Sequence, residues 1–175
     1  MYGRRPCQNN KNAACGNTNR INTNRMAPNH TNASAEEHTK PTDRGPAPLV
    51  LNIEKATKEN NTFRTALWTG NHLQLTLMSI KSGEDIGLEN HPNLDQFLRI
   101  EQGEGLVKMG GSQEKLNLQQ RVSSGSAIII PAGTWHNLIN TGKQPLKLYS
   151  IYAPPQHPKG TVHKTKEDAI AAETH

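Results

Sequence analysis

The chain of 175 residues carries a net charge of +5, and this charge is spread unevenly. Residues 1–45 hold seven Lys and Arg against three Asp and Glu, whereas residues 46–175 hold thirteen against twelve. Nucleic-acid binding needs basic side chains gathered on a folded face, so the nearly neutral remainder excludes that class for the domain. No apolar run approaches the roughly 20 residues of a membrane span, and no apolar signal segment is evident. We therefore expect a cytoplasmic protein without nucleic-acid or membrane partners.

Residues 1–45 form a basic segment rich in Asn, Thr, Pro and Ala, in which Ile21 is the only aliphatic residue larger than Ala apart from Met. Such a composition buries too little apolar area to offset chain entropy, which predicts a disordered tail. Cys7 and Cys15 lie in this tail with a spacing that fits no common zinc pattern, and we interpret them as free thiols.

After residue 45 the chain changes to short apolar or alternating runs separated by Gly, Asn and Pro. This pattern is typical of an all-β domain with many short strands, which we place at residues 46–160. The predicted strands are Val50–Ile53, Leu73–Ile80, Ile86–Glu89, Asp95–Glu101, Leu106–Met109, Lys115–Gln120, Ser126–Ile130, Trp135–Asn140 and Leu146–Tyr152. Nine short strands indicate a sandwich or a barrel.

The last segment, residues 161–175, is predicted to be an extension with one short helix. Thr165 followed three residues later by Asp168 resembles a capping box and predicts a helix over Lys166–Glu173.

The most informative segment runs from Gly83 to Gly103. Glu89 and His91 lie two apart on a predicted strand, so both side chains leave the same face. Gln96 begins another strand and shares its face with Leu98 and Ile100, whereas Asp95, Phe97, Arg99 and Glu101 take the opposite face.

A second segment, residues 125–140, aims one histidine inward. A buried apolar strand ends at Pro131, Gly133 permits a tight reversal, and His136 returns on the next strand with Leu138 and Asn140 on its face. A buried imidazole in that position needs a partner.

These two segments resemble the paired motifs of the cupin family. The second segment matches G-x5-P-x-G-x2-H-x3-N at every fixed position, namely Gly125, Pro131, Gly133, His136 and Asn140. The first resembles G-x5-H-x-H-x3-4-E-x6-G through Gly83, His91 and Gly103, with Glu89 in place of the first histidine and Gln96 in place of the glutamate. The 21 residues between the motifs are an ordinary cupin spacer.

The resemblance implies a small single-domain cupin, an all-β double-stranded β-helix or jelly-roll barrel. It further implies one divalent metal ion inside the barrel mouth, held by Glu89, His91, Gln96 and His136. Two imidazoles and a carboxylate suit Fe, Mn, Ni or Zn, and a glutamine carbonyl adds a neutral oxygen. The combination is similar to that of cupin-type phosphomannose isomerases, in a different order.

Alternatives remain at several positions. Asp95 could turn inward in place of Gln96, or Gln96 could bind only a metal-bound water. Glu89 is a candidate base as well as a ligand. We interpret His157 and His163, in a Pro-rich segment, as exposed loop residues, with capping of the barrel mouth as the alternative.

The expected function is therefore that of a metal-binding cupin acting on a small polar molecule. Sugar or sugar-phosphate isomerisation and dioxygenation are the enzymatic hypotheses, although alternation places no Arg or Lys in the mouth to hold a phosphate. The alternatives are a non-catalytic module that binds a small ligand or the metal itself, and a structural or coat-type protein. By resemblance we also expect a homodimer, paired through an outer sheet.

Overall fold

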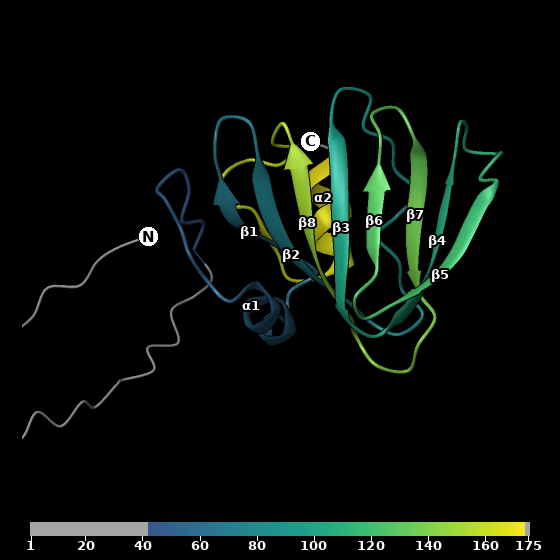
Figure 1. The fold of residues 1–175 in the computed structure, drawn as a ribbon, viewed down its shortest axis with the longest axis horizontal. Helices are drawn as coiled ribbons and strands as arrows, with labels where there is room; N and C mark the ends of the chain where they lie inside the picture. Colours follow the sequence, from purple (N-terminus) through teal and green to yellow (C-terminus); the bar gives the residue numbers. More distant parts are fainter. Residues whose placement is uncertain (1–41, 174–175) are drawn as a thin grey trace, which may run out of the picture. The chain divides into compact units, whose positions relative to one another are not determined.

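Two antiparallel sheets face each other in the computed structural model, which describes residues 42–173 (Figure 1). The larger sheet has the strand order β6-β3-β8-β2-β1-β9 and the smaller one β5-β4-β7. The strands are β1 Arg64–Thr69, β2 Gln74–Ile80, β3 Asp95–Gln102, β4 Glu104–Gly110, β5 Leu118–Ser123, β6 Ala127–Ile130, β7 Trp135–Asn140, β8 Leu146–Ala153 and β9 Val162–His163, and the helices are α1 Ile53–Glu59 and α2 Lys166–Glu173. The expected all-β jelly roll with a short carboxyl-terminal helix is confirmed.

The space between the sheets changes from polar to apolar along the strands. Directly paired residues of antiparallel strands share a face, so the register defines layers of inward-facing side chains. The outermost layer of the larger sheet holds Gln74, Tyr152 and Gln96. Two layers further in, Met78, Leu148 and Ile100 pair in the same way and belong to the hydrophobic core. We call the polar end the mouth and the apolar end the base.

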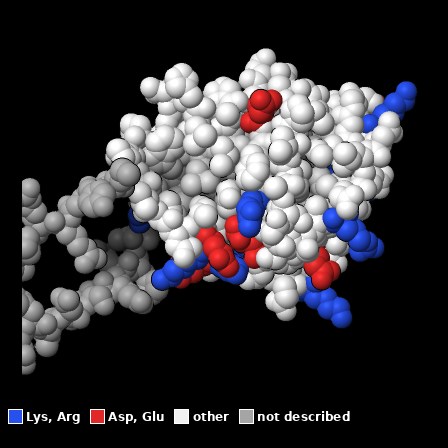
Figure 2. Space-filling view, viewed as in Figure 1, with Lys and Arg blue, Asp and Glu red and all other residues white. Residues whose placement is uncertain are grey.

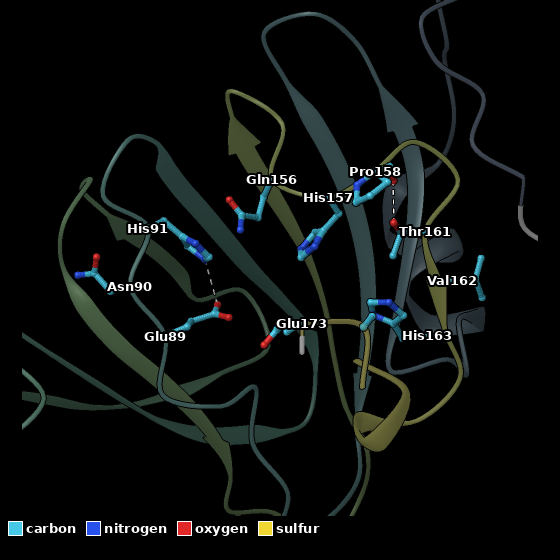
Figure 3. A pocket seen from close by; sticks show the side chains of 11 residues that line it. Glu89, Asn90, His91, Gln156, His157, Pro158, Thr161, Val162, His163 and Glu173 are labelled. Carbon is cyan, nitrogen blue, oxygen red and sulfur yellow. Dashed lines mark hydrogen bonds and ion pairs between the residues drawn. The ribbon is translucent and has the colours of Figure 1, made fainter. Parts of the chain in front are cut away.

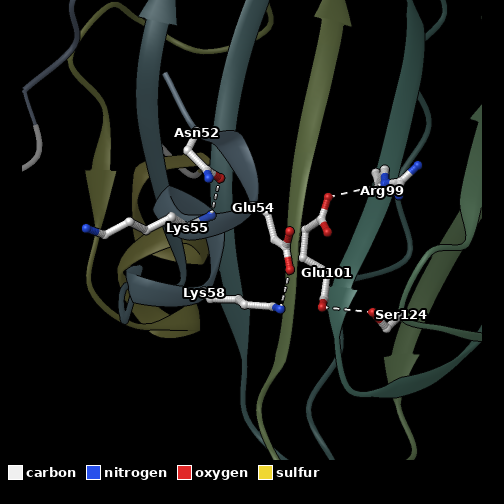
Figure 4. Close-up of polar contacts among 7 residues, drawn as sticks. All are labelled: Asn52, Glu54, Lys55, Lys58, Arg99, Glu101 and Ser124. Atoms are coloured by element: carbon white, nitrogen blue, oxygen red, sulfur yellow. Dashed lines mark hydrogen bonds and ion pairs between the residues drawn. The ribbon is translucent and has the colours of Figure 1, made fainter. Parts of the chain in front are cut away.

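The predicted strand at Val50–Ile53 is wrong, because helix α1 begins at Ile53. The side chain of Asn52 caps the helix by accepting a hydrogen bond from the Lys55 amide at 2.9 Å, and Glu54 pairs with Lys58 one turn later (Figure 4). The cap and this pair favour a helix over an extended continuation of the preceding apolar run. Val50 itself is 99% exposed.

Charged side chains gather beside helix α1 on the outer surface of the larger sheet. Helix α1 packs against β8, β3 and β2, and the pair of Arg99 with Glu101 lies beside it on β3 (Figure 4). On the face drawn in Figure 2, basic and acidic side chains lie intermixed below the centre of the barrel. That face therefore has no broad basic patch among the described residues.

Two further strand predictions need correction. The segment expected to form a strand at residues 86–89 makes only isolated bridges to β7, at Asp85 and Glu89, and the strand expected at 115–120 is shifted to Leu118–Ser123. Strands β1 and β9 were not predicted. The burial pattern of β1 does not alternate over its first four residues, so it lacks the period of two by which a strand is recognised.

Contacts with the barrel extend beyond residues 46–160 at both ends. Asp43 lies in the expected tail but accepts hydrogen bonds from the amides of Thr69 and Gly160, at 2.9 and 3.0 Å. In the expected extension, β9 adds a strand to the larger sheet. The rest of the tail, including Cys7 and Cys15, lies outside the described residues. Within residues 42–173, no helix has the length and apolar character needed to cross a membrane.

Candidate metal centre and adjoining cavity

The segment containing Glu89 is bound directly to strand β7. The backbones of Glu89 and His136 exchange two hydrogen bonds of 3.0 Å each, and the carbonyl of His91 accepts a bond of 2.8 Å from the Gly133 amide. Gly133 has φ +78°, a conformation that glycine adopts most readily. The reversal before β7 thus brings the two motif segments side by side, the arrangement that the resemblance to cupins implies.

The three motif side chains converge on one point. One carboxylate oxygen of Glu89, Oε1, lies 3.4 Å from Nε2 of His91 and 3.2 Å from Nε2 of His136. Ligands bound at about 2.1 Å to a tetrahedral or octahedral ion are separated by about 3.0–3.4 Å. The two distances from Glu89 Oε1 agree with this separation, and all three ligand atoms lie within 4.8 Å of one another, so the cluster could hold one metal ion.

The protonation of His136 strengthens this fit. The side chain is 1% exposed, and its Nδ1 lies 2.9 Å from the carbonyl oxygen of Thr134. A carbonyl only accepts hydrogen bonds, so Nδ1 must carry a hydrogen. A neutral His136 then points the lone pair of Nε2 at the carboxylate of Glu89, and a proton or a metal cation is needed between them.

Glu89 remains an anion at neutral pH. Burial acts to raise the pKa of Glu89. This effect is outweighed by the hydrogen bond with His136, the contact with His91 and the positive charge of Arg64, which together lower the pKa to about 2. A carboxylate that stays ionised is the form that binds a metal.

Gln96 lies on the inner face of β3 and is 2% exposed. Its amide nitrogen donates to Oγ of Ser150 at 3.1 Å, whereas its buried carbonyl oxygen has no hydrogen-bond partner within residues 42–173. Asp95 points away, is exposed and accepts a hydrogen bond from the Ala132 amide at 2.9 Å. The orientation therefore favours Gln96 over Asp95 as the fourth ligand, which stays a prediction.

A cavity of about 510 Å³ opens beside the three converging residues. Glu89 and His91 line one side, and His157 and His163 line the other (Figure 3). The last turn of α2 contributes Glu173 to the wall. The extension after β8 therefore completes the cavity.

His157 and His163 are half-buried in the cavity wall, which corrects the interpretation of both as exposed loop residues. Gln74, fully buried in the outermost layer, fixes the backbone of His157: its amide nitrogen donates to the His157 carbonyl at 2.8 Å and its oxygen accepts from the His157 amide at 2.9 Å. The His157 ring lies edge-on to Tyr152, with centroids 5.1 Å apart, and Tyr152 lies 5.8 Å from His91.

Burial also determines the charge of these rings. Burial, followed by the nearby positive charge of Arg64, lowers the pKa of His157 to about 3. The pKa of His163 is lowered by the same two causes, and burial raises that of Tyr152. His157 and Tyr152 are therefore neutral around pH 7.

Sequence reasoning missed Arg64, the first residue of β1. It pairs with Met78 of β2 and with His163 of β9, so its side chain enters the barrel interior, where it is 1% exposed. A charged residue in a short strand ordinarily marks a surface position, and only the register of β1 places it inside.

Comparison with known proteins agrees with this architecture. The family profile described as "Cupin domain" matches residues 76–152, which contain both motif segments and the three converging side chains. The chain belongs to the cupin family.

The relatives are uncharacterised proteins. The chain is 72% identical over 131 residues to the uncharacterized protein YrkC of Bacillus subtilis, covering 75% of this chain and 70% of that protein. It is 41% identical over 114 residues to the uncharacterized protein L612 of Acanthamoeba polyphaga mimivirus, covering 65% and 69%. Among solved structures, BH2720 of Bacillus halodurans is 68% identical with a TM-score of 0.74, covering 74% of this chain and 98% of that one.

Proposed function

We propose that this cupin is a metal-dependent enzyme that binds one divalent ion and acts on a small polar molecule in the adjoining cavity. The observation that carries the proposal is the convergence of Glu89 Oε1 with the Nε2 atoms of His91 and His136 at 3.4 and 3.2 Å. The unpartnered carbonyl oxygen of Gln96 supports a fourth bond from the protein.

The chain's own residues define the coordination. Glu89 offsets one of the two charges of a divalent ion, the two histidines contribute neutral nitrogen, and Gln96 contributes neutral oxygen. Thr134 keeps the Nε2 lone pair of His136 directed at the ion through the bond to Nδ1. Four protein ligands leave two positions of an octahedral ion for a substrate.

Two reactions suit this ligand set. A bound divalent ion would supply Lewis acidity or, as iron, redox chemistry. Two histidines and one carboxylate with open positions are typical of non-haem Fe(II) oxygenases, which supports dioxygenation. The addition of one Gln supports sugar or sugar-phosphate isomerisation, through the similarity to the donor set of cupin-type phosphomannose isomerases.

The test begins with the metal content of the full-length protein purified without added metal. Each of Fe, Mn, Ni and Zn is then restored to metal-free protein, and O₂ consumption and aldose–ketose interconversion are measured over a panel of sugars, sugar phosphates and small acids. We expect turnover with one ion and its loss in His136→Ala, whereas His72→Ala, which changes an exposed histidine, serves as the matched control.

Binding without turnover across the panel would support a non-catalytic ligand-binding cupin instead. Failure to take up any of the four metals would overturn the proposal.

A further inference from the structure

Arg64 is a buried cation whose charge no carboxylate among residues 42–173 neutralises in an ion pair. Its side-chain atoms Nε and Nη1 are buried and have no hydrogen-bond partner in this part of the chain. Its Cζ lies over the ring of Phe63, 5.5 Å from the ring centroid. A buried charge without a partner destabilises a fold, so the packing of the barrel does not explain why an arginine occupies this position.

The charge of Arg64 acts on the residues that line the cavity. It lies close enough to Glu89, His157 and His163 to influence all three electrostatically. His163 is also its direct neighbour in the pairing of β1 with β9. The guanidinium therefore lies behind the wall that the two histidines form.

That wall carries unused hydrogen-bonding groups. Nε2 of His157 and Nδ1 of His163 are buried and have no hydrogen-bond partner among the described residues. Each nitrogen can carry a hydrogen in one neutral tautomer and then donate to a ligand. In Figure 3 both rings lie across the cavity from His91 and Glu89. The cavity thus has a metal-binding side and a side that combines hydrogen-bond donors with a positive charge.

We infer that the His157–His163 side of the cavity, backed by Arg64, binds the anionic group of the substrate, a carboxylate or a phosphate. This inference rests on the proposed function and deepens it, because the other end of the same molecule would reach the metal ligands. An oxyanion accepts several hydrogen bonds at once and would compensate the unpartnered guanidinium. The Glu173 carboxylate, on the same wall, repels such a ligand and weakens its binding.

The experiment uses isothermal titration calorimetry on the full-length, metal-free protein with three probes of similar size: lactate, glycerol 3-phosphate and neutral glycerol. At least one acid is expected to bind while glycerol does not, and the acid that binds identifies the group as carboxylate or phosphate. Arg64→Met should weaken that binding by at least about tenfold. Glu173→Gln should strengthen it by up to about fivefold, the range of an exposed charge.

Stability measurements separate recognition from packing. Methionine replaces the unbranched stem of arginine and carries no charge, so Arg64→Met is expected to keep or raise the melting temperature. If that variant does not fold, Glu173→Gln decides, because Glu173 is exposed at the end of α2 and its change leaves the interior intact.

Binding of neither acid at tens of millimolar, equal binding of glycerol, or unchanged affinity in both variants would each overturn the inference. Because the titrations use metal-free protein, these outcomes are independent of metal uptake. A chain that binds the acid but no metal would refute the proposed function and leave the anion site standing.

Discussion

The base of the barrel interior is closed by apolar side chains, whereas the mouth is lined by buried polar groups with unused hydrogen-bonding atoms. In the base, Ile80, Leu138 and Leu146 are fully buried. Toward the mouth, one side-chain atom each of His91, Gln96, His157 and His163 lacks a hydrogen-bond partner among the described residues. Arg64, which starts from the layer of Met78, adds its unpartnered Nε and Nη1. Most buried polar groups in folded proteins are paired.

This difference assigns separate tasks to the two regions. The base supplies the apolar burial that stabilises the barrel, whereas the mouth reduces that stability and keeps donors and acceptors available for the metal and ligand that we propose. Variants in the base should therefore change unfolding, and variants in the mouth should change binding.

The largest expected effect is on the base. Ile100→Ala removes a fully buried side chain from the core and should lower the free energy of unfolding by about 2–5 kcal/mol. Val50→Ala, at a 99% exposed position, should change it by less than about 0.5 kcal/mol. Urea denaturation measures both, and equal effects would contradict the division into base and mouth.

Next is the metal affinity of the mouth. His136→Ala removes a ligand held in place by Thr134 and should lower the affinity for a divalent ion by more than about 100-fold, since loss of a supporting partner alone costs about 10–100-fold. Competition with a chromogenic chelator measures this, with His72→Ala as the control. If His136→Ala retained the native affinity, the ion would bind elsewhere.

The sequence predicted the part of the site that lies within its motifs. Glu89 and His91 share a face because they are two apart, and the Pro131–Gly133 reversal returns His136 to them. The same alternation along a strand predicted that Gln96 and Asp95 lie on opposite faces, with Gln96 on the face of Leu98 and Ile100. These relations depend on short-range geometry, which a single sequence carries directly.

The remaining parts depend on long-range pairing, which the sequence does not display. Arg64 faces inward only because β1 pairs in register with β2 and β9. His157 is in the wall because Gln74, 83 positions away in the chain, binds its backbone. Helix α1 was missed because the apolar run Val50–Ile53 favoured a strand and the Asn52 cap was not recognised.

A smaller effect is expected at Gln96, and it separates the two candidates for the fourth ligand. Gln96→Leu removes the unpartnered carbonyl and should lower metal affinity by about tenfold, the low end of the range for supporting groups. The free energy of unfolding of the metal-free protein should change by no more than about 1.5 kcal/mol, because only the hydrogen bond to Ser150 is lost.

Asp95→Asn is the matched control, since asparagine keeps an acceptor for the Ala132 amide. If Asp95→Asn lowered metal affinity and Gln96→Leu did not, the assignment of the fourth ligand would be reversed.

The smallest effect concerns pH. The pKa of His157 is lowered from its ordinary value of 6.5 to about 3, so between these values the unfolded chain binds a proton that the folded chain does not. Protonation of His157 therefore has no effect on the free energy of unfolding above pH 6.5. The free energy of unfolding decreases progressively as the pH falls from 6.5 toward 3. Between pH 6.5 and 5, above the range in which Glu89 titrates, His157→Gln should show a shallower fall in melting temperature than the native protein. If the melting temperatures of the two proteins fell equally over this pH range, the fold would not keep His157 from binding a proton.

The most direct test of the metal centre is X-ray absorption spectroscopy of the protein loaded with one equivalent of its preferred ion. We expect nitrogen and oxygen ligands at about 2.1 Å with the scattering of two imidazoles, and loss of one imidazole in His91→Ala. A spectrum without imidazole scattering, or one unchanged by His91→Ala, would contradict a centre built on Glu89, His91 and His136.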